Sequence, residues 1–248
     1  RRVLFRSRFW VAMALGVALQ LCSVQAGTVG FSNQSGSYFS FQNMSEKGDN
    51  VPPSNLEAPT LYTNPYDSIQ FKPSAFVAVE SQLGTLETKT VSSTLFLTTL
   101  ATASLPLNKL MIDLAGTYYE SAIPGPGSSV LASSLSLDPI KFTIGSETKT
   151  WTPTMSITRN TVDRTWGGHL EVTQNDLRTL FNTPSLQVTQ LGIESTATVS
   201  ATAQWGNANS YLTFLSFSTQ PIPEPNTMSL CLLAGLIAIK KRTKTINH

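Results

Sequence analysis

Apolar and polar side chains alternate along most of the chain between residues 27 and 220. Residues 196–203 alternate Thr or Ser with Ala or Val, and residues 109–114 alternate around Leu110, Ile112 and Leu114. A period of two is that of a β-strand with one buried and one solvated face. The same reasoning predicts strands over 154–158, 169–173, 27–31, 38–42, 76–81, 85–101, 139–144 and 185–193. Residues 211–219 are apolar on both faces, so we expect that strand inside a sheet.

Turn residues separate these segments, notably in 48–53, 124–127, 167–168 and 206–207. One short helix is predicted over 175–181, with Thr173 or Asn175 as its N-cap. Nine or ten strands and one short helix predict an all-β fold, a single two-sheet sandwich whose preferred topology is a lectin-like jelly roll. The alternative is two small sandwiches divided near 124–129.

The C-terminal segment, 221–248, differs in character from the rest of the chain. An apolar run over 228–239 is followed by a basic cluster of Lys240, Lys241, Arg242 and Lys244. As a helix the run is about 18 Å long at ~1.5 Å per residue. A bilayer core is about 30 Å thick, so the run spans it only if the helix extends and the basic side chains snorkel. We therefore expect a C-terminal apolar helix serving as a membrane anchor with its basic end in the cytoplasm, the alternative being a buried helix.

Pro223, Glu224 and Pro225 precede that run and lie in a proline-stiffened linker, 221–226. The motif, the run and the basic cluster together closely resemble the PEP-CTERM sorting signal of Gram-negative envelope proteins. The resemblance covers only the last tenth of the chain. It implies that an exosortase recognises Pro223, Glu224 and Pro225, processes the tail and passes the protein to the surface or the extracellular polysaccharide.

The N-terminal segment, 1–26, has the organisation of a signal peptide. Arg1, Arg2 and two further arginines precede an apolar region over 9–21, predicted as a signal helix. Small residues place the cleavage between Ala26 and Gly27. Cys22 leaves a lipoprotein site as an alternative, and the paired arginines leave a twin-arginine export signal.

Both ends together change what the global charge means. The whole chain carries a formal charge of +2, but residues 27–220 contain nine basic and 14 acidic residues, a net charge of −5. The basic character therefore belongs to the ends, and we expect no nucleic-acid partner. Both cysteines, Cys22 and Cys231, also lie in the ends, so no disulfide links the strands of the domain.

Candidate chemistry in residues 27–220 is sparse. His169 is the one histidine there, and with Glu171 it lies on one face of a predicted strand, as a weak metal or acid/base pair or as part of an exposed polar face. Oxygen ligands for Ca²⁺ are available at Asp67, Asp113, Asp138 and Asp163, and carboxylates for glycoside hydrolysis at Glu80, Glu120, Glu171 and Glu194. Neither set has a characteristic spacing. We expect no enzyme, no metal and no cofactor.

Aromatic residues give a further hypothesis, because carbohydrate-binding proteins stack sugar rings on exposed Trp and Tyr. Trp166 and Trp205 stand next to glycines, and Tyr211 begins the last predicted strand. We consider these three as glycan-binding residues, with Trp151, Tyr118 and Tyr119 as further candidates. The alternative is that these rings pack in the core.

Two functional hypotheses follow. The first is an exported, non-catalytic β-sandwich associated with the cell envelope and extracellular polysaccharide, with exosortase and the export machinery as processing partners and the membrane as a transient one. The second is a carbohydrate-binding module with a defined glycan site. An enzyme is a distant third.

Overall fold

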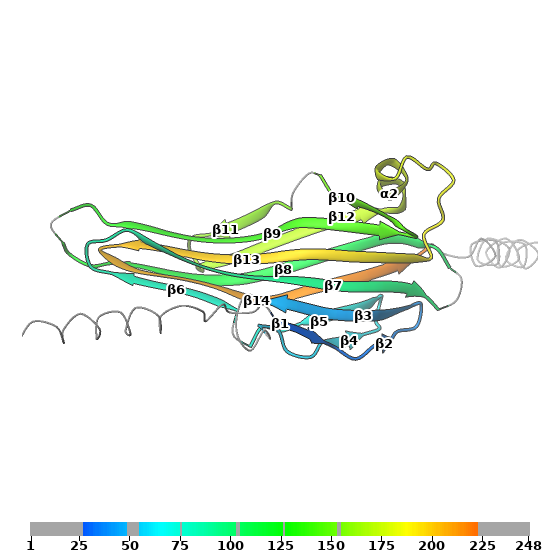
Figure 1. Cartoon of the computed structure of the whole chain (residues 1–248), viewed down its shortest axis with the longest axis horizontal. Helices are drawn as coiled ribbons and strands as arrows, with labels where there is room; N and C mark the ends of the chain where they lie inside the picture. The colour runs from blue at the N-terminus through cyan, green and yellow to red at the C-terminus, as the bar shows by residue number, and fades with distance from the viewer. Residues whose placement is uncertain are drawn as a thin grey trace, which may run out of the picture.

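The computed structural model describes residues 27–48, 55–74, 76–102, 105–125, 127–152 and 155–222. They form two antiparallel sheets packed face to face, as the alternation predicts (Figure 1). Sheet A has the order β1-β3-β7-β13-β9-β10, with β2 beside β3; sheet B has the order β11-β12-β8-β14-β5-β4, with β6 beside β14. The strands of sheet A are β1 (Gly27–Gly30), β2 (Gln34–Ser35), β3 (Phe39–Gly48), β7 (Glu87–Ala101), β9 (Val130–Ile144), β10 (Glu147–Thr150) and β13 (Gln190–Gln204). Those of sheet B are β4 (Thr60–Tyr62), β5 (Asp67–Phe71), β6 (Val77–Gln82), β8 (Leu107–Ala122), β11 (Ile157–Asn160), β12 (Thr165–Thr173) and β14 (Gly206–Pro221).

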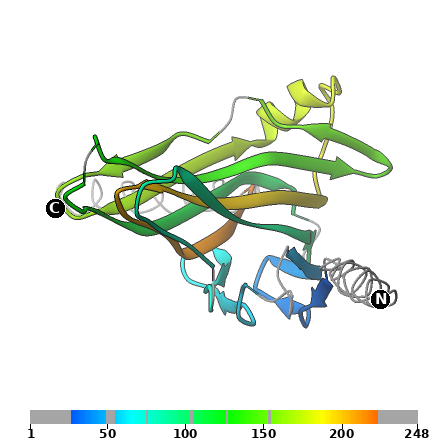
Figure 2. The ribbon, with the colours of Figure 1, turned by 60° about the vertical axis from the view of Figure 1, so that its left-hand side comes forward.

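Long strands give the molecule its elongated shape. β7, β8, β9, β13 and β14 have 15 or 16 residues each, which corresponds to about 50 Å at ~3.3 Å per residue. β1 to β5 lie along one side of these strands (Figure 2). β13 lies between β7 and β9, and β14 between β8 and β5, so strands before and after residues 124–129 share both sheets. The last predicted strand is therefore interior, as expected.

Helix α2 (Gln174–Leu180) begins one residue before its predicted start. Thr173 is the N-cap, and it forms a capping box with Asp176, in which each side chain accepts a hydrogen bond from the other residue's backbone N–H. The helix connects β12 of sheet B to β13 of sheet A.

The core side chains change in size along the sandwich, and we call the end filled by large side chains the wide end and the opposite end the narrow end. At the wide end large apolar side chains fill the interior, and Phe71 packs edge-on against Phe217 with ring centroids 6.4 Å apart. At the narrow end small residues replace them. There Ser210 Oγ in sheet B donates to the backbone oxygen of Ser134 in sheet A at 2.8 Å. A hydroxyl can reach the other sheet's backbone only where the two sheets lie close together. The largest fully buried side chains are Phe39, Phe41, Phe71, Phe142, Phe217, Met44, Ile69, Leu95, Leu107, Leu110, Ile112 and Leu137.

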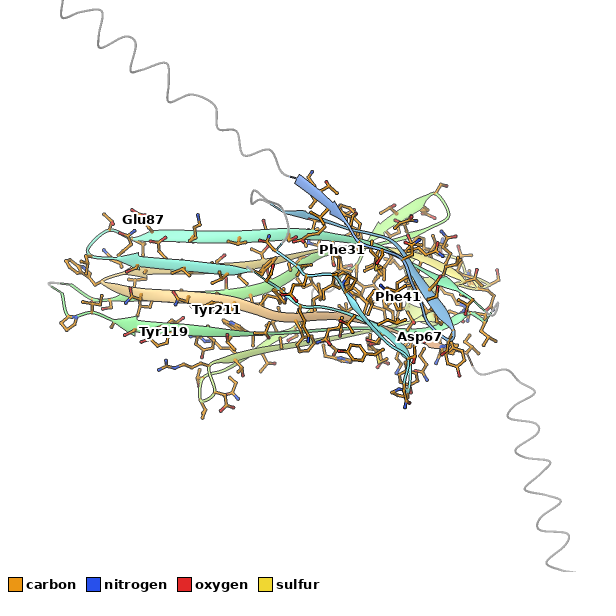
Figure 3. The ribbon with its side chains drawn as sticks, turned by 90° about the horizontal axis from the view of Figure 1, so that it is seen from below. Phe31, Phe41, Asp67, Glu87, Tyr119 and Tyr211 are labelled. Atoms are coloured by element: carbon orange, nitrogen blue, oxygen red, sulfur yellow. The ribbon has the colours of Figure 1, made fainter. Side chains whose placement is uncertain are left out.

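Two buried carboxylates hold the N-terminal strands. Asp67 is fully buried and accepts hydrogen bonds from the backbone N–H groups of Ser37, Tyr38 and Phe39 at 2.8, 2.5 and 2.7 Å. It thereby joins β5 of sheet B to the start of β3 in sheet A (Figure 3). A Cβ on Gly36 would lie 2.3 Å from the Asp67 carboxyl carbon, so only glycine fits this turn.

Glu46, also fully buried, accepts from Ser93 Oγ at 2.5 Å and from the backbone N–H groups of Asn55 and Leu56 at 3.1 Å. Burial raises the pKa of the Glu46 carboxyl above its ordinary value of 4.5, and these hydrogen bonds offset part of the shift. A carboxyl with a raised folded-state pKa costs stability once it is ionised in both folded and unfolded chains. That cost disappears as the pH falls through the raised pKa toward 4.5.

The outer face of sheet A carries a ladder of hydroxyl side chains from β7 and β13. Thr88 pairs with Thr202, Thr90 with Ser200 and Thr94 with Thr196, with oxygen–oxygen distances of 2.8, 3.1 and 2.9 Å. These pairs lie directly opposite each other in the strand register. Cross-strand Thr pairs of this kind stabilise a sheet by about 0.2–1 kcal/mol each.

The predicted signal helix over 1–26, with Ala26 at the cleavage site, lies outside the described residues, whereas Gly27 is the first residue of β1. The tail is also outside them, including Pro223, Glu224, Pro225, Lys240, Lys241, Arg242 and Lys244. Within the described part of the chain, no helix is long and apolar enough to cross a membrane.

Candidate functional site

Trp166, considered from the sequence either as a glycan-binding residue or as part of the core, is buried in the structure. Only 8% of the residue is exposed, and its ring centroid lies 4.9 Å from that of Tyr118. The Arg159 guanidinium covers both rings, 4.0 Å from the Tyr118 centroid and 5.3 Å from that of Trp166. Gly116 leaves the space for the indole, since a Cβ there would lie 3.1 Å from Trp166 Cδ1. Trp166 therefore belongs to the core and offers no stacking face.

Trp205 closes the narrow end of the sandwich. It stands between β13 and β14 with a positive φ of 56°, a conformation that allows the tight reversal between the two long strands. Its indole packs against two loops, because a Cβ on Gly125 would meet it at 2.5 Å and a Cβ on Gly84 at 3.3 Å. The half-buried ring, itself in the β13–β14 connection, therefore packs against the β6–β7 connection at Gly84 and the β8–β9 connection at Gly125. Trp151 packs edge-on against Phe142 in a similar structural role.

Tyr211, the third aromatic candidate, lies on the outer face of sheet B. It is half-buried, stands opposite Thr117 of β8 and Val77 of β6, and its hydroxyl accepts a hydrogen bond from Asn209 Nδ2 at 3.3 Å. Tyr119 lies on the neighbouring strand of the same face (Figure 3). Of the three aromatic residues proposed from the sequence, Tyr211 is the one on an open sheet face.

A groove crosses the outer face of sheet B. Its volume is about 830 Å³. Residues of β11, β12, β8, β14, β5 and β4 all contribute to its lining. Ala115 and Gly167 leave the floor low, and a Cβ added to Gly167 would meet no atom within 4 Å. The lining residues are Tyr62, Ser68, Gln70, Asp113, Leu114, Ala115, Ser156, Thr158, Gly167, Gly168, His169, Phe214 and Ser216. Asp113 and His169 are the ionisable side chains among them apart from the phenol of Tyr62.

His169 and Glu171 lie on the same exposed face of β12, as the sequence indicates, but each has a different partner. His169 Nδ1 lies 2.5 Å from Asp113 Oδ1, a residue directly opposite it on β8, whereas Glu171 forms an ion pair with Lys109 at 2.7 Å. A carboxylate bound to Nδ1 orients the imidazole and leaves Nε2 for a second partner. The pair can therefore anchor a ligand hydroxyl. No hydroxyl of the described residues hydrogen-bonds to the ring, so the geometry presents no assembled nucleophile.

The acidic candidates are dispersed. Asp67 binds backbone N–H groups, Asp113 binds His169, Asp163 accepts from Asn160 at 2.8 Å, and Asp138 lies in β9. No group of three or more His, Cys, Asp or Glu residues within the described ranges could hold a metal ion. Of the four glutamates, Glu120 pairs with Arg159, Glu194 with Lys141 and Glu171 with Lys109, while Glu80 accepts from Gln82. None of them lines the groove.

Sequence reasoning missed most of the groove. Tyr62 and Gln70 lie on the consecutive strands β4 and β5, which were not predicted at all, and Phe214 comes from β14, far along the chain. Gly167 and Gly168 were predicted as a turn but lie inside β12, so the open floor of the groove was not foreseen. One signal was present, because residues 211–219, which include Phe214, were predicted to be apolar on both faces. No family model and no curated protein matches the sequence.

Proposed function

We propose that the domain is a non-catalytic carbohydrate-binding sandwich that holds a glycan in the groove of sheet B. The observation that carries this proposal is the composition of the groove. An exposed tyrosine, Tyr62, and a half-buried phenylalanine, Phe214, accompany hydroxyl and amide groups such as those of Ser216 and Gln70. Aromatic rings stack on the apolar faces of sugars, and hydroxyl and amide groups exchange hydrogen bonds with sugar hydroxyls.

The lining also favours binding without hydrolysis. Glycosidases use two carboxyl groups on opposite sides of the scissile bond. Asp113 is the one carboxylate among the residues that line the groove, and it is already bonded to His169. A single carboxylate that orients a histidine suits recognition of a hydroxyl better than acid/base catalysis.

The sequence signals supply the cellular context of the proposal. An exported protein of a Gram-negative bacterium, processed by an exosortase at Pro223, Glu224 and Pro225, would meet extracellular polysaccharide at the cell surface. The membrane would be a transient partner, held through the tail before processing. A lectin-like jelly roll remains the finer interpretation of the fold, since its crossovers between two antiparallel sheets are of the kind found in Greek-key sandwiches.

A blocking substitution tests the groove. Gly167→Phe places a ring over the open floor without a close contact at Cβ, so we expect a folded protein that no longer binds glycans. Gly30→Phe is the matched control, because a Cβ on Gly30 of β1 also meets nothing within 4 Å. The full chain in detergent is applied to an array of neutral and acidic glycans. Binding lost only in Gly167→Phe supports the proposal; binding of no glycan by the wild type, or equal binding by all three proteins, refutes it.

The sorting part of the proposal has a separate test. Native protein recovered from envelope and matrix fractions is analysed by intact mass spectrometry. A chain that begins at Gly27 and ends near Pro223 to Pro225 supports signal cleavage and exosortase processing. A chain that retains His248 contradicts processing at the tail and leaves the groove proposal untouched.

A further inference from the structure

The groove does not end at Phe214. Three more apolar side chains continue from it along β14 on the outer face of sheet B. Tyr211 follows on β14 itself, and Tyr119 and Val79 stand on either side of Asn209, on β8 and β6 respectively. Tyr119 is 43% exposed and Val79 is 51% exposed. Phe214, Tyr211, Tyr119 and Val79 together form what we call the β14 strip.

The rings of the β14 strip are held in place. Asn209 Nδ2 donates to the Tyr211 hydroxyl, and the Arg164 guanidinium lies 5.1 Å from the centroid of the Tyr119 ring. Fixed rings lose little conformational entropy when a ligand stacks on them. Half-exposed apolar side chains on an otherwise polar strand face, kept rigid, are a feature of binding surfaces.

The strip and the groove have the dimensions of a site for a chain molecule. From Asn209 to Ser216 the distance along β14 is about 23 Å at ~3.3 Å per residue. Hydroxyl and amide side chains alternate with the rings over this length, at Asn209, Thr117 and Ser216. A linear polymer of repeating rings and hydroxyls can satisfy both kinds of contact in each repeat.

Charge distinguishes among such polymers. Apart from the phenol of Tyr62, the ionisable side chains of the groove are Asp113 and its partner His169, and Arg164 at the far end already contacts Tyr119. A polyanion would meet the Asp113 carboxylate in the groove and no unpaired lysine there. The lining therefore matches a neutral polysaccharide.

We propose that the groove and the β14 strip form one extended site that binds internal segments of a neutral polysaccharide chain lying along β14. This inference rests on the proposed function and adds the class of ligand and the orientation of the chain. It predicts that affinity increases with the number of sugar units until the chain reaches Tyr119.

Chain-length dependence of binding tests the inference. Oligosaccharides of the neutral glycan that binds best on the array, from dimer to octamer, are titrated into the full chain by calorimetry. Tyr119→Ala should weaken binding of the octamer about tenfold and leave binding of the dimer unchanged. Tyr38→Ala is the matched control, since Tyr38 is 38% exposed and lies outside the groove and the strip.

Each other outcome decides against the inference in a different way. Equal affinity for dimer and octamer, or equal binding by the wild type and Tyr119→Ala, refutes the extended site while leaving the groove as a glycan site. Tighter binding of an acidic polysaccharide refutes the choice of a neutral ligand. A wild type that sediments as a dimer, and becomes a monomer in Tyr119→Ala, assigns the strip to contact between copies. A wild type that binds no glycan of any length refutes the proposed function itself.

Discussion

Asp67 joins the two sheets at the wide end, and its replacement by alanine should destabilise the domain strongly. The carboxylate accepts three backbone N–H groups from the turn before β3, at 2.5–2.8 Å. Asp67→Ala leaves those donors without their acceptor. The change also loosens the start of β5, which carries Ser68 and Gln70 of the groove.

The expected loss can be worked out from the burial of each donor. A hydrogen bond to a charged group contributes about 1.5–3 kcal/mol, and a buried donor left unpaired costs about 1–3 kcal/mol. The Phe39 N–H is buried, so its cost is paid in full, whereas Ser37 and Tyr38 are exposed and water can replace the carboxylate there. We therefore expect a loss of about 2–4 kcal/mol, a large part of the 5–15 kcal/mol typical of a domain.

Urea unfolding of the full chain, followed by tryptophan fluorescence, measures the loss. Asp67→Asn keeps one carbonyl oxygen and should give an intermediate value. Gly36 supplies an internal check, because a Cβ there collides with the carboxylate at 2.3 Å. Gly36→Ala should cost about 1–3 kcal/mol in the wild type and much less in Asp67→Ala, where the space is free. A loss below about 1 kcal/mol for Asp67→Ala, or additive costs in the double variant, would refute the reasoning.

Three further changes test other parts of the structure. Burial raises the pKa of Glu46, so the wild type should lose stability relative to Glu46→Gln as the pH rises from 4.5 through that pKa. Urea unfolding of both proteins over a pH series measures the difference in stability. A difference that does not change with pH contradicts the expectation. Gly125→Ala should lower Tm by several degrees because its Cβ meets an indole at 2.5 Å, whereas Gly127→Ala, at 3.6 Å, should melt like the wild type; similar melting of both variants by circular dichroism argues against the packing. A double-mutant cycle of Thr94→Ala and Thr196→Ala should give a coupling of about 0.5 kcal/mol in chemical unfolding, and strictly additive costs would mean that the hydroxyl pair contributes nothing.

The strands of the wide end could be predicted from sequence because their inward side chains are large. β7 was predicted over 85–101 and runs from Glu87 to Ala101, and the inner positions there include Leu95 and Leu97. A period of two between large apolar and polar residues is a strong signal. The N-cap of α2 at Thr173 could equally be predicted, because the capping box involves residues close together in sequence.

The strands of the narrow end were predicted too short for the opposite reason. β9 was predicted only over 139–144, yet it begins at Val130. In its first half an inward position is occupied by Ser133, which is buried and donates to the backbone of β14. Likewise Gly206 was taken as part of a turn but begins β14, with Ala208 and Ser210 facing inward. Small inward residues remove the contrast in hydropathy that reveals a strand.

The site was harder to predict than the fold because it depends on register between distant strands. His169 and Asp113 are 56 residues apart, and their contact follows from the pairing of β12 with β8. The sequence suggested Glu171 because it is nearest along the same face, but Lys109 lies within reach of that carboxylate. The aromatic candidates lie on opposite faces of their strands for a similar reason. Trp166 faces inward and Tyr211 outward, and each orientation is set by the register of its strand.

The two outer faces of the sandwich differ in a way that supports sheet B as the binding face. On sheet A, hydroxyls of β7 and β13 bond to each other across the strands, so a ligand there would compete with hydrogen bonds already made. On sheet B, the floor at Gly167 is open and rings at Tyr62 and Tyr119 remain exposed. Stacking on exposed rings removes apolar surface from water, whereas exchanging one hydroxyl partner for another gains little net free energy. A domain with these two faces should therefore bind through sheet B, and Thr94→Ala on sheet A should leave glycan affinity unchanged while Tyr62→Ala lowers it.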